Sequence, residues 1–334
     1  GDPRFRQIDL PENRGEGLAR KAGILASTGT YIMFLDSDDY FRHDACKIAY
    51  RKISAENTDI VQFGAEVIAS PNVTVGELNG LYGFLEPYNG TSAGELIRAC
   101  LERQNFGYTI WNKIYNGDIV RKAVTLFANE RFNIAADVYL FYLIAMFSNS
   151  YSSVSDKLYF YRFGAGITGG KEIDDRIIEN RIRQGRIHQL LTKFSEEYDP
   201  SGITDRSLDK LEQRFITDVI SGWESMHSRP NMKKQFSLAL ECFDEKRFLG
   251  YIMQFYNSGD YRRKVSMIRD WKESGTLEAE PHPVKTVATF YQRMYNGGVE
   301  RVISKLIPIW LKLGMRVILF TDELERPADY EYPN

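Results

Sequence analysis

Two kinds of apolar pattern alternate along the first part of the chain. Residues 13–27 carry apolar side chains at helical spacing, and the apolar run at residues 31–35 predicts a buried strand. A helix is expected to begin at the aspartates that follow and to run through residues 43–57, before a strand at residues 59–68. This alternation predicts an α/β fold with a mostly parallel, helix-covered sheet.

The same alternation continues to about residue 170. Residues 71–89 are rich in Gly and Asn and predict a loop or hairpin, whereas Ser92 with Glu95 three residues later predicts a helix start. Beyond it the pattern predicts a strand, a buried helix and a second strand, at residues 108–116, 137–147 and 157–163.

The pattern changes near residue 172. Long amphipathic segments predict a helical region at 171–276, which could be a spacer, a dimer surface or a membrane-surface contact. A Pro- and Glu-containing linker follows at 277–285, and residues 286–334 predict a strand, a helix and a strand, one βαβ unit. Residues 1–170 form the remaining predicted domain.

Composition excludes several function classes. A net charge of −2 over 334 residues gives no basic surface for nucleic acid. The three cysteines and four histidines are scattered, so neither a disulfide framework nor a His/Cys metal site is expected. No apolar run is long enough to span a bilayer. These features favour a reducing, cytoplasmic location, with peripheral contact at the inner membrane face left open.

Three aspartates directly follow the first predicted strand. Asp36 and Asp38 are two residues apart across a turn, so their carboxylates can converge on one cation. Oxygen ligands favour Mg²⁺ or Mn²⁺, and Mg²⁺ usually completes its shell with water and substrate phosphates. The alternative is that these residues close a turn and cap a helix, and Asp39 is assigned to that supporting role.

Residues 13–40, NRGEGLARKAGILASTGTYIMFLDSDDY, resemble the central signature of family 2 glycosyltransferases, the bacterial inverting enzymes of GT-A fold. Lys21 stands where the family usually has Asn. The matching positions are Asn13, Gly15, Ala19, Arg20, Gly23, Gly29, Tyr31, Phe34, Leu35, Asp36, Ser37, Asp38 and Asp39.

The resemblance implies roles for these residues. Asp38 would be the direct metal ligand, and Asp36 would lie nearer the ribose and the water shell of the metal. Arg20, with Asn13 and Gly15, would belong to the nucleotide side of the site; a structural salt bridge is the alternative for Arg20. The implied donor is a nucleotide-diphosphate sugar, a UDP-sugar above all, and the implied acceptor is a glycan or lipid-linked saccharide.

The family also places a carboxylate base at the head of a later helix. Asp137 occupies that position, and Ala136 stands where the family usually has Glu. Asp137 would take the proton of the acceptor hydroxyl, although it also suits a plain helix start. On the acceptor side, Trp111 could stack on a sugar, Lys113 could meet phosphate and Arg162 could assist the diphosphate, with an amphipathic edge strand as the alternative.

The last 45 residues resemble the opening of a family 4 glycosyltransferase of GT-B fold, in which Gly297 and Gly298 would form a ligand-binding turn. The family 2 domain normally opens with two strands that would precede Gly1. We therefore expect residues 1–170 to be a partial GT-A domain, and this stretch alone to be inactive.

The expected activity is hexosyl transfer with inversion, in bacterial surface polysaccharide assembly. A degenerate domain that binds glycan or scaffolds a partner is the main alternative, suggested by Ala136 and by the helical region. A nucleotidyltransferase also uses Mg²⁺ and an α/β sheet, and it is a third hypothesis for the function.

Overall fold

The computed structural model describes residues 2, 4–71, 73, 75–88, 90, 93–164, 173–226, 231–256, 286–293, 306–308, 310–312 and 316–323. The chain divides into two compact units, Gly1–Tyr251 and Ile252–Asn334, and each is described by itself. The boundaries predicted at residues 170, 276 and 285 stay a prediction.

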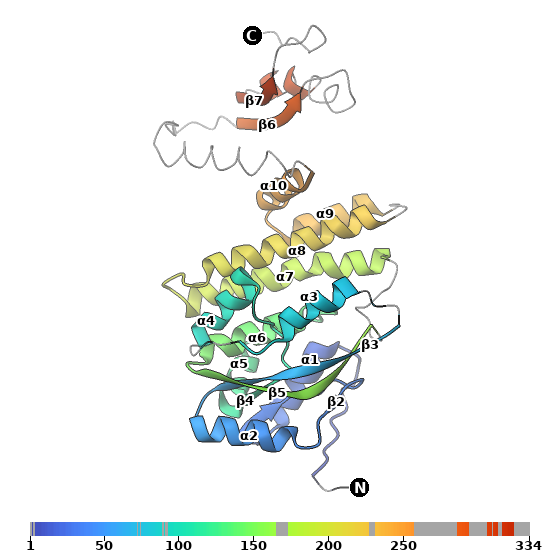
Figure 1. The fold of residues 1–334 in the computed structure, drawn as a ribbon. Helices are drawn as coiled ribbons and strands as arrows, with labels where there is room; N and C mark the ends of the chain where they lie inside the picture. Colours follow the sequence, from blue (N-terminus) through green and yellow to red (C-terminus); the bar gives the residue numbers. More distant parts are fainter. Residues whose placement is uncertain are drawn as a thin grey trace. The chain divides into compact units, whose positions relative to one another are not determined.

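The first unit is built on a five-stranded sheet in the order β1-β4-β3-β5-β2 (Figure 1). The strands are β1 (Tyr31–Met33), β2 (Tyr40–Phe41), β3 (Ile60–Ala69), β4 (Lys113–Asn116) and β5 (Tyr151–Phe163). Only β3 and β5 pair in parallel, whereas β1–β4, β4–β3 and β2–β5 are antiparallel. The α/β class is confirmed, but the sheet is mixed rather than mostly parallel, because β4 and β2 run against the other three strands.

The aspartate-bearing segment crosses one end of this sheet. It joins β1, at one edge of the sheet, to β2, at the opposite edge. Residues 34–39 make this crossing and include a turn, in which the Asp39 backbone N–H donates to the Asp36 carbonyl oxygen at 3.2 Å. The expectation of a helix that begins at the aspartates is therefore wrong: the chain forms β2 first, and the helix starts only at Ala45.

Helices cover both faces of the sheet. Helix α2 (Ala45–Glu56) packs on β3, β4 and β5 through fully buried Ala45, Ala49 and Ile53. Figure 1 shows α2 on one face and α3 to α6 on the other. Helix α1 (Glu16–Ala26) packs on α5 (Gly117–Thr125) and α6 (Ala136–Phe147). The predicted helix at residues 137–147 is thus confirmed.

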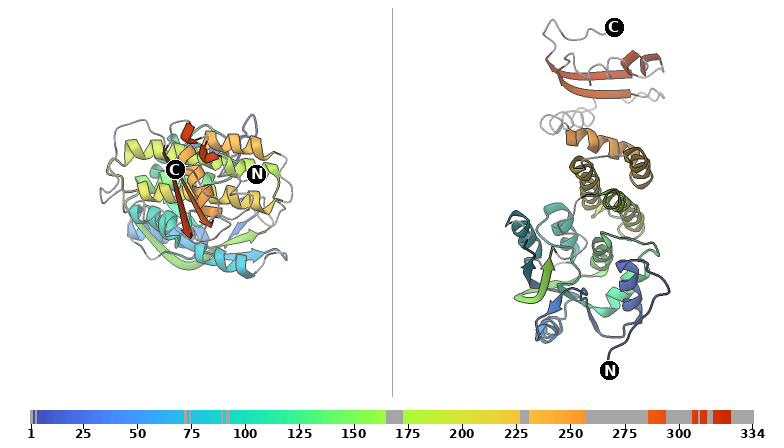
Figure 2. Two further views of the ribbon diagram at one scale, coloured as in Figure 1. Left: turned by 90° about the horizontal axis from the view of Figure 1, so that it is seen from above. Right: turned by 90° about the vertical axis from the view of Figure 1, so that its right-hand side faces the viewer.

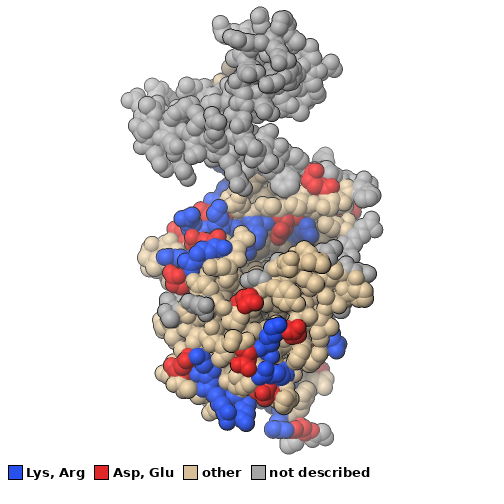
Figure 3. Space-filling model, in the orientation of Figure 1, with Lys and Arg blue, Asp and Glu red and all other residues tan. Residues whose placement is uncertain are grey.

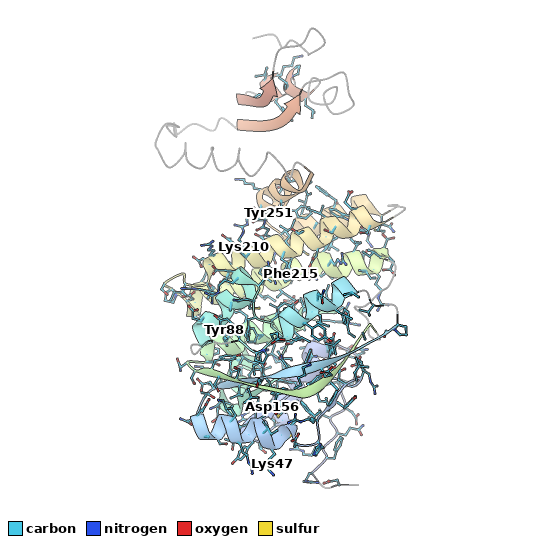
Figure 4. The ribbon with its side chains drawn as sticks, in the orientation of Figure 1. Lys47, Tyr88, Asp156, Lys210, Phe215 and Tyr251 are labelled. Atoms are coloured by element: carbon cyan, nitrogen blue, oxygen red, sulfur yellow. The ribbon has the colours of Figure 1, made fainter. Side chains whose placement is uncertain are left out.

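Residues 71–89 are not a loop or hairpin, because α3 (Val75–Leu85) is helical despite its glycines. Tertiary packing outweighs the poor helix propensity of Gly here: Leu85 is buried, and the ring of Phe84 meets Tyr108 edge-on at 5.0 Å. After the helix, the backbone N–H of Tyr88, labelled in Figure 4, donates to Gln62 on β3. Helix α4 (Ala93–Arg98) continues into a π-helical turn, η1 (Ala99–Arg103).

The predicted helical region contains α7 (Asp175–Tyr198), α8 (Asp205–Ser225), α9 (Met232–Cys242) and α10 (Glu245–Tyr256), seen from two sides in Figure 2. Helix α7 packs on α6, α8 and α9, and α8 packs on η1. The loop before α6 is tied to α7 by the ion pair of Glu130 with Arg186. These helices therefore support the α/β core rather than act as a spacer. A bilayer-spanning helix is not found in the described part of the chain.

In the second unit, β6 (Thr286–Arg293) and β7 (Arg316–Glu323) pair in parallel. Residues 306–308 and 310–312, between them in sequence, are helical. This arrangement confirms the predicted strand, helix and strand, since a parallel pair needs a crossover connection. Gly297 and Gly298 lie outside the described residues.

The contact between α1 and α6 depends on a glycine. A Cβ atom on Gly17 would lie 2.9 Å from Cζ of Phe127 and 3.2 Å from Cβ of Ala136. The ring of Phe127 cannot move away freely, because it is buried and stacked on Tyr139 at 4.4 Å. We expect Gly17→Ala to lower the free energy of unfolding by about 1–2 kcal/mol, measured by urea denaturation.

Gly23→Ala is the matched control, because it lies on the same helix with nothing within 4 Å of its added Cβ. This variant should be neutral or more stable by up to about 1 kcal/mol, since Ala is the better helix former. Equal effects of the two substitutions would contradict the proposed close contact of α1 with α6.

Candidate active site

The candidate site lies where three segments meet: α1, the crossing segment after β1, and the first turn of α6. Arg20 on α1 joins them. Its Nη1 lies 2.7 Å from Asp137 Oδ1, and its Nη2 lies 2.8 Å from Asp36 Oδ1. Glu16, one helical turn earlier, lies 3.3 Å from the same Nη1. The structure thus brings together three of the sequence-predicted residues, Arg20, Asp36 and Asp137.

Asp38 and Asp39 have different surroundings. Asp39 accepts hydrogen bonds from the Tyr159 hydroxyl at 2.8 Å and from the Arg162 backbone N–H at 2.8 Å. It therefore fixes the crossing segment to β5, as the supporting role requires. Asp38 is exposed, and no hydrogen bond or ion pair joins it to the described residues. Its carboxylate is available to a ligand.

Asp137 lies in the first turn of α6 but does not cap it. The N-cap residue is Ala135, with φ +62°, and no side chain accepts a capping hydrogen bond there. The carboxylate of Asp137 instead pairs with Arg20. Ala136 is buried against α1 beside Gly17, so this surface has no room for the Glu that the family usually carries.

The pKa values of Asp137 and Arg20 are both raised, for different reasons. Burial raises the pKa of Asp137 to about 7, although the Arg20 guanidinium acts against this rise. Burial also works to lower the pKa of Arg20, but Asp137, Glu16 and Asp36 outweigh it, and the pKa is raised. Arg20 therefore stays charged, while Asp137 can exchange a proton near neutral pH.

Asn13 and Gly15 form the entry to α1. The Asn13 side chain accepts the Gly15 backbone N–H at 3.0 Å, and Gly15 is the N-cap residue with φ +84°. A Cβ atom on Gly15 would also lie 3.1 Å from the Phe132 carbonyl oxygen. These contacts account for both residue types as determinants of the start of α1, while their predicted nucleotide role is not tested.

The structure corrects two acceptor-side expectations. Trp111 is only 3% exposed, and its ring stacks on Tyr159 and Tyr161 at 4.3 and 4.9 Å. Lys113 is fully buried, and its ammonium donates to Gly107 O, Thr109 O and Asn112 Oδ1. A ring and an ammonium held in this way are not free for a sugar or a phosphate, so both act as internal supports.

Arg162 does lie beside the aspartates. Its backbone N–H donates a hydrogen bond to Asp39, its side chain is exposed, and its guanidinium lies 5.6 Å from the ring centre of Tyr40.

Two residues of the site, Tyr159 and Glu16, were not predicted from the sequence. Tyr159 accepts the Asp36 backbone N–H at 3.2 Å, and Glu16 pairs with Arg20. The i,i+4 spacing of Glu16 and Arg20 was the available signal for Glu16.

The donor set fits a hard divalent cation in part. No described cluster of three or more acidic, His or Cys side chains could hold a metal by itself. Asp38, however, is exposed, and Asp36 uses only Oδ1 in the ion pair with Arg20. Two carboxylates with open oxygens suit Mg²⁺, which binds through one or two carboxylates and substrate phosphates.

Comparison with known proteins gives this site a family context. The family described as glycosyl transferase family 2 matches residues 1–109, which include α1 and the aspartates. EpsH of Bacillus subtilis (strain 168), a protein named as a glycosyltransferase, is 28% identical over 73% of this chain and 68% of its own length. The family match is confined to residues 1–109, whereas the likeness to EpsH extends over most of the chain.

Two further relatives match shorter stretches. Glycosyltransferase GlyA of Streptococcus pneumoniae is 26% identical over 46% of this chain and 22% of its own length. The succinoglycan biosynthesis protein ExoO of Rhizobium meliloti is 45% identical over 18% of this chain and 19% of its own. Both matches are thus local, and each covers about a fifth of the relative's own length.

Among solved structures, residues 1–349 of TarS from S. aureus with UDP-GlcNAc align with 75% of this chain and 74% of that chain. The identity is 16% and the TM-score is 0.40.

The raised pKa of Asp137 predicts how stability depends on pH. Between the unfolded pKa near ~3.9 and the folded value of about 7, the folded state binds the proton more tightly. Protonated Asp137 therefore stabilises the folded state fully at a pH below this window. This contribution decreases as the pH rises across the window, and it is lost once the pH passes about 7. We expect wild type to lose roughly 2–3 kcal/mol relative to Asp137→Asn between pH 5 and pH 8, measured by urea denaturation at both values.

Asp118→Asn is the control, because Asp118 lies in the first turn of α5 with its side chain 92% exposed. Its stability difference from wild type should not change with pH in this range. A destabilised Asp137→Asn protein at pH 8 would instead identify Asp137 as a structural residue of the ion pair.

Proposed function

We propose that this protein is an inverting glycosyltransferase that moves a sugar from a nucleotide diphosphate to a glycan or lipid-linked acceptor. The observation that carries the proposal is that Arg20 brings Asp36 and Asp137 together, with Asp38 exposed two residues after Asp36 and the pKa of Asp137 raised to about 7. One side of the site offers carboxylates to a cation, and the other offers a proton acceptor.

The residues divide the chemistry between them. Asp38, with the free oxygen of Asp36, would hold Mg²⁺ or Mn²⁺, which would neutralise charge on the departing diphosphate. Asp137 takes the proton of the acceptor hydroxyl while that oxygen bonds to the anomeric carbon. The carbon–diphosphate bond breaks, its electron pair leaves with the diphosphate, and attack from the opposite face inverts the centre.

The donor proposed is a UDP-sugar, with hexosyl transfer as the reaction type, and the setting is bacterial surface polysaccharide assembly at the cytoplasmic face of the membrane. The support is the family match and the names of EpsH and ExoO. On the face shown in Figure 3, basic and acidic side chains are interspersed, so this face does not offer a large single-sign surface to nucleic acid.

We also propose that the second unit belongs to a GT-B-type transferase domain; Gly297 and Gly298, the predicted ligand turn, lie outside the described residues. The support is the parallel pairing of β6 with β7 and the helical residues between them in sequence. The complete protein would then add two sugars to one growing glycan.

The metal role of Asp38 is tested on the complete gene product purified from its host. Calorimetry measures UDP binding with Mn²⁺ and with EDTA. We expect binding to require Mn²⁺ and Asp38→Asn to weaken it at least about tenfold, because the diphosphate loses its bridging cation. Asp118→Asn should bind as wild type does, and metal-independent binding would contradict this site.

The base role of Asp137 is tested by sugar transfer from a panel of UDP-sugars to membrane-extracted acceptors. Asp137→Asn should lower kcat by about 10²–10⁴-fold while UDP binding is retained. Alternatively, a degenerate glycan-binding domain would show no transfer in wild type and no cellular phenotype for Asp137→Asn, and this outcome would replace the enzyme proposal.

A further inference from the structure

Arg20 is surrounded by more negative charge than it can balance. Its guanidinium contacts carboxylates from three separate places: Glu16 on α1, Asp36 after β1, and Asp137 on α6. A purely structural ion pair of a partly buried arginine is stable when opposite charges match. Three carboxylates around one guanidinium leave an excess of negative charge, which is the arrangement expected where a cation or a proton must be received.

The guanidinium holds only one oxygen of each partner aspartate. The Oδ1 atoms of Asp36 and Asp137 accept from Arg20, while neither Oδ2 atom has a hydrogen bond within the described residues. The Arg20 side chain is 14% exposed, less than Asp36 at 30% and Asp137 at 22%. Arg20 is therefore more shielded from solvent than the two carboxylates, and it engages one oxygen of each.

The position of Arg20 is fixed by the close contact of α1 with α6. Gly17 and Arg20 are three residues apart and share one face of α1, so Gly17 meets Ala136 while Arg20 reaches the next residue, Asp137. A larger side chain at either small position would push the helices apart. The small residue at position 136 thus permits the ion pair of Arg20 with Asp137.

We propose that Arg20 is a positioning residue, which orients Asp137 for proton transfer and links it to Asp36. The carboxylate of Glu16 partly offsets the positive charge of Arg20. This inference rests on the proposed function, because it takes Asp137 as the proton acceptor. Arg20 contacts neither the donor sugar nor the acceptor in this role. Instead it holds Oδ1 of Asp137, so that Oδ2 receives the acceptor proton while the sugar–diphosphate bond breaks.

Several other groups face Asp137 from the elements around it. The charged ones are Arg20 and Glu16 on α1, Asp36 in the crossing segment and Lys113 on β4, and the charge of Asp137 in turn raises the pKa of Tyr108, Tyr115 and Tyr161. Of the four charged groups, Glu16 and Arg20 act in opposite directions on the proton affinity of Asp137. Substituting each one therefore gives effects of opposite sign.

The test measures kcat against pH for wild type, Arg20→Gln, Arg20→Lys and Glu16→Gln in the complete gene product. Arg20→Gln should lower kcat about 10- to 100-fold and move the acidic limb of the profile to higher pH, because Asp137 loses its cation. Glu16→Gln should move that limb to lower pH, because a neighbouring negative charge is removed. Arg20→Lys should restore the limb but not the full kcat, since Lys lacks the forked donors.

Matched controls are Arg42→Gln and Glu66→Gln. Arg42 also bridges two aspartates, Asp44 and Asp156, and Glu66 pairs with Lys157. Figure 4 labels Asp156 on β5. Neither control should move the profile. Since the Glu16 side chain is 48% exposed, Glu16→Gln is expected to fold even where Arg20→Gln does not.

The outcomes separate this inference from the function on which it rests. An unchanged profile in Glu16→Gln and Arg20→Gln, or shifts of the same sign in both, would overturn the positioning role while Asp137→Asn stays inactive. Full activity in Asp137→Asn would instead overturn the proposed function itself.

Discussion

A partly buried guanidinium must be matched by negative charge, because removing a charge from water costs several kcal/mol. Arg20 meets this requirement with carboxylates from α1, α6 and the segment after β1. The same contacts that satisfy Arg20 also bring Asp36 and Asp137 to one place. Stability and the geometry of the candidate site are therefore set by one interaction, and neither can change without the other.

The sheet topology provides the other half of the site. The chain must cross from one edge of the sheet to the opposite edge within a few residues, so the aspartates are drawn over the ends of the strands. Tyr159 fixes this crossing on β5 by receiving the Asp36 N–H and donating to Asp39. Both carboxylate oxygens of Asp39 accept hydrogen bonds from β5, whereas Asp38, one residue earlier, is exposed.

The helices that follow the sheet complete the unit. Helix α7 holds the loop before α6 through the Glu130–Arg186 ion pair, and Asn133 in that loop donates to Asn180 on α7 at 2.9 Å. These contacts fix the backbone from which Asp137 projects. A region that is uninformative in sequence thus positions a residue at the centre of the site.

The sequence alone determined the α/β class and the main helices and strands, and it pointed to Asp36, Asp38 and Asp137 as candidate site residues, because apolar periodicity and local motifs are encoded by neighbouring residues. Tertiary structure decided the antiparallel pairing of β4, the helix at Val75–Leu85, and the burial of Trp111 and Lys113. It also decided that Arg20 pairs with Asp137, 117 positions away in the chain. These features depend on which surfaces meet across the fold, and contacts between distant residues leave no periodic trace in the chain.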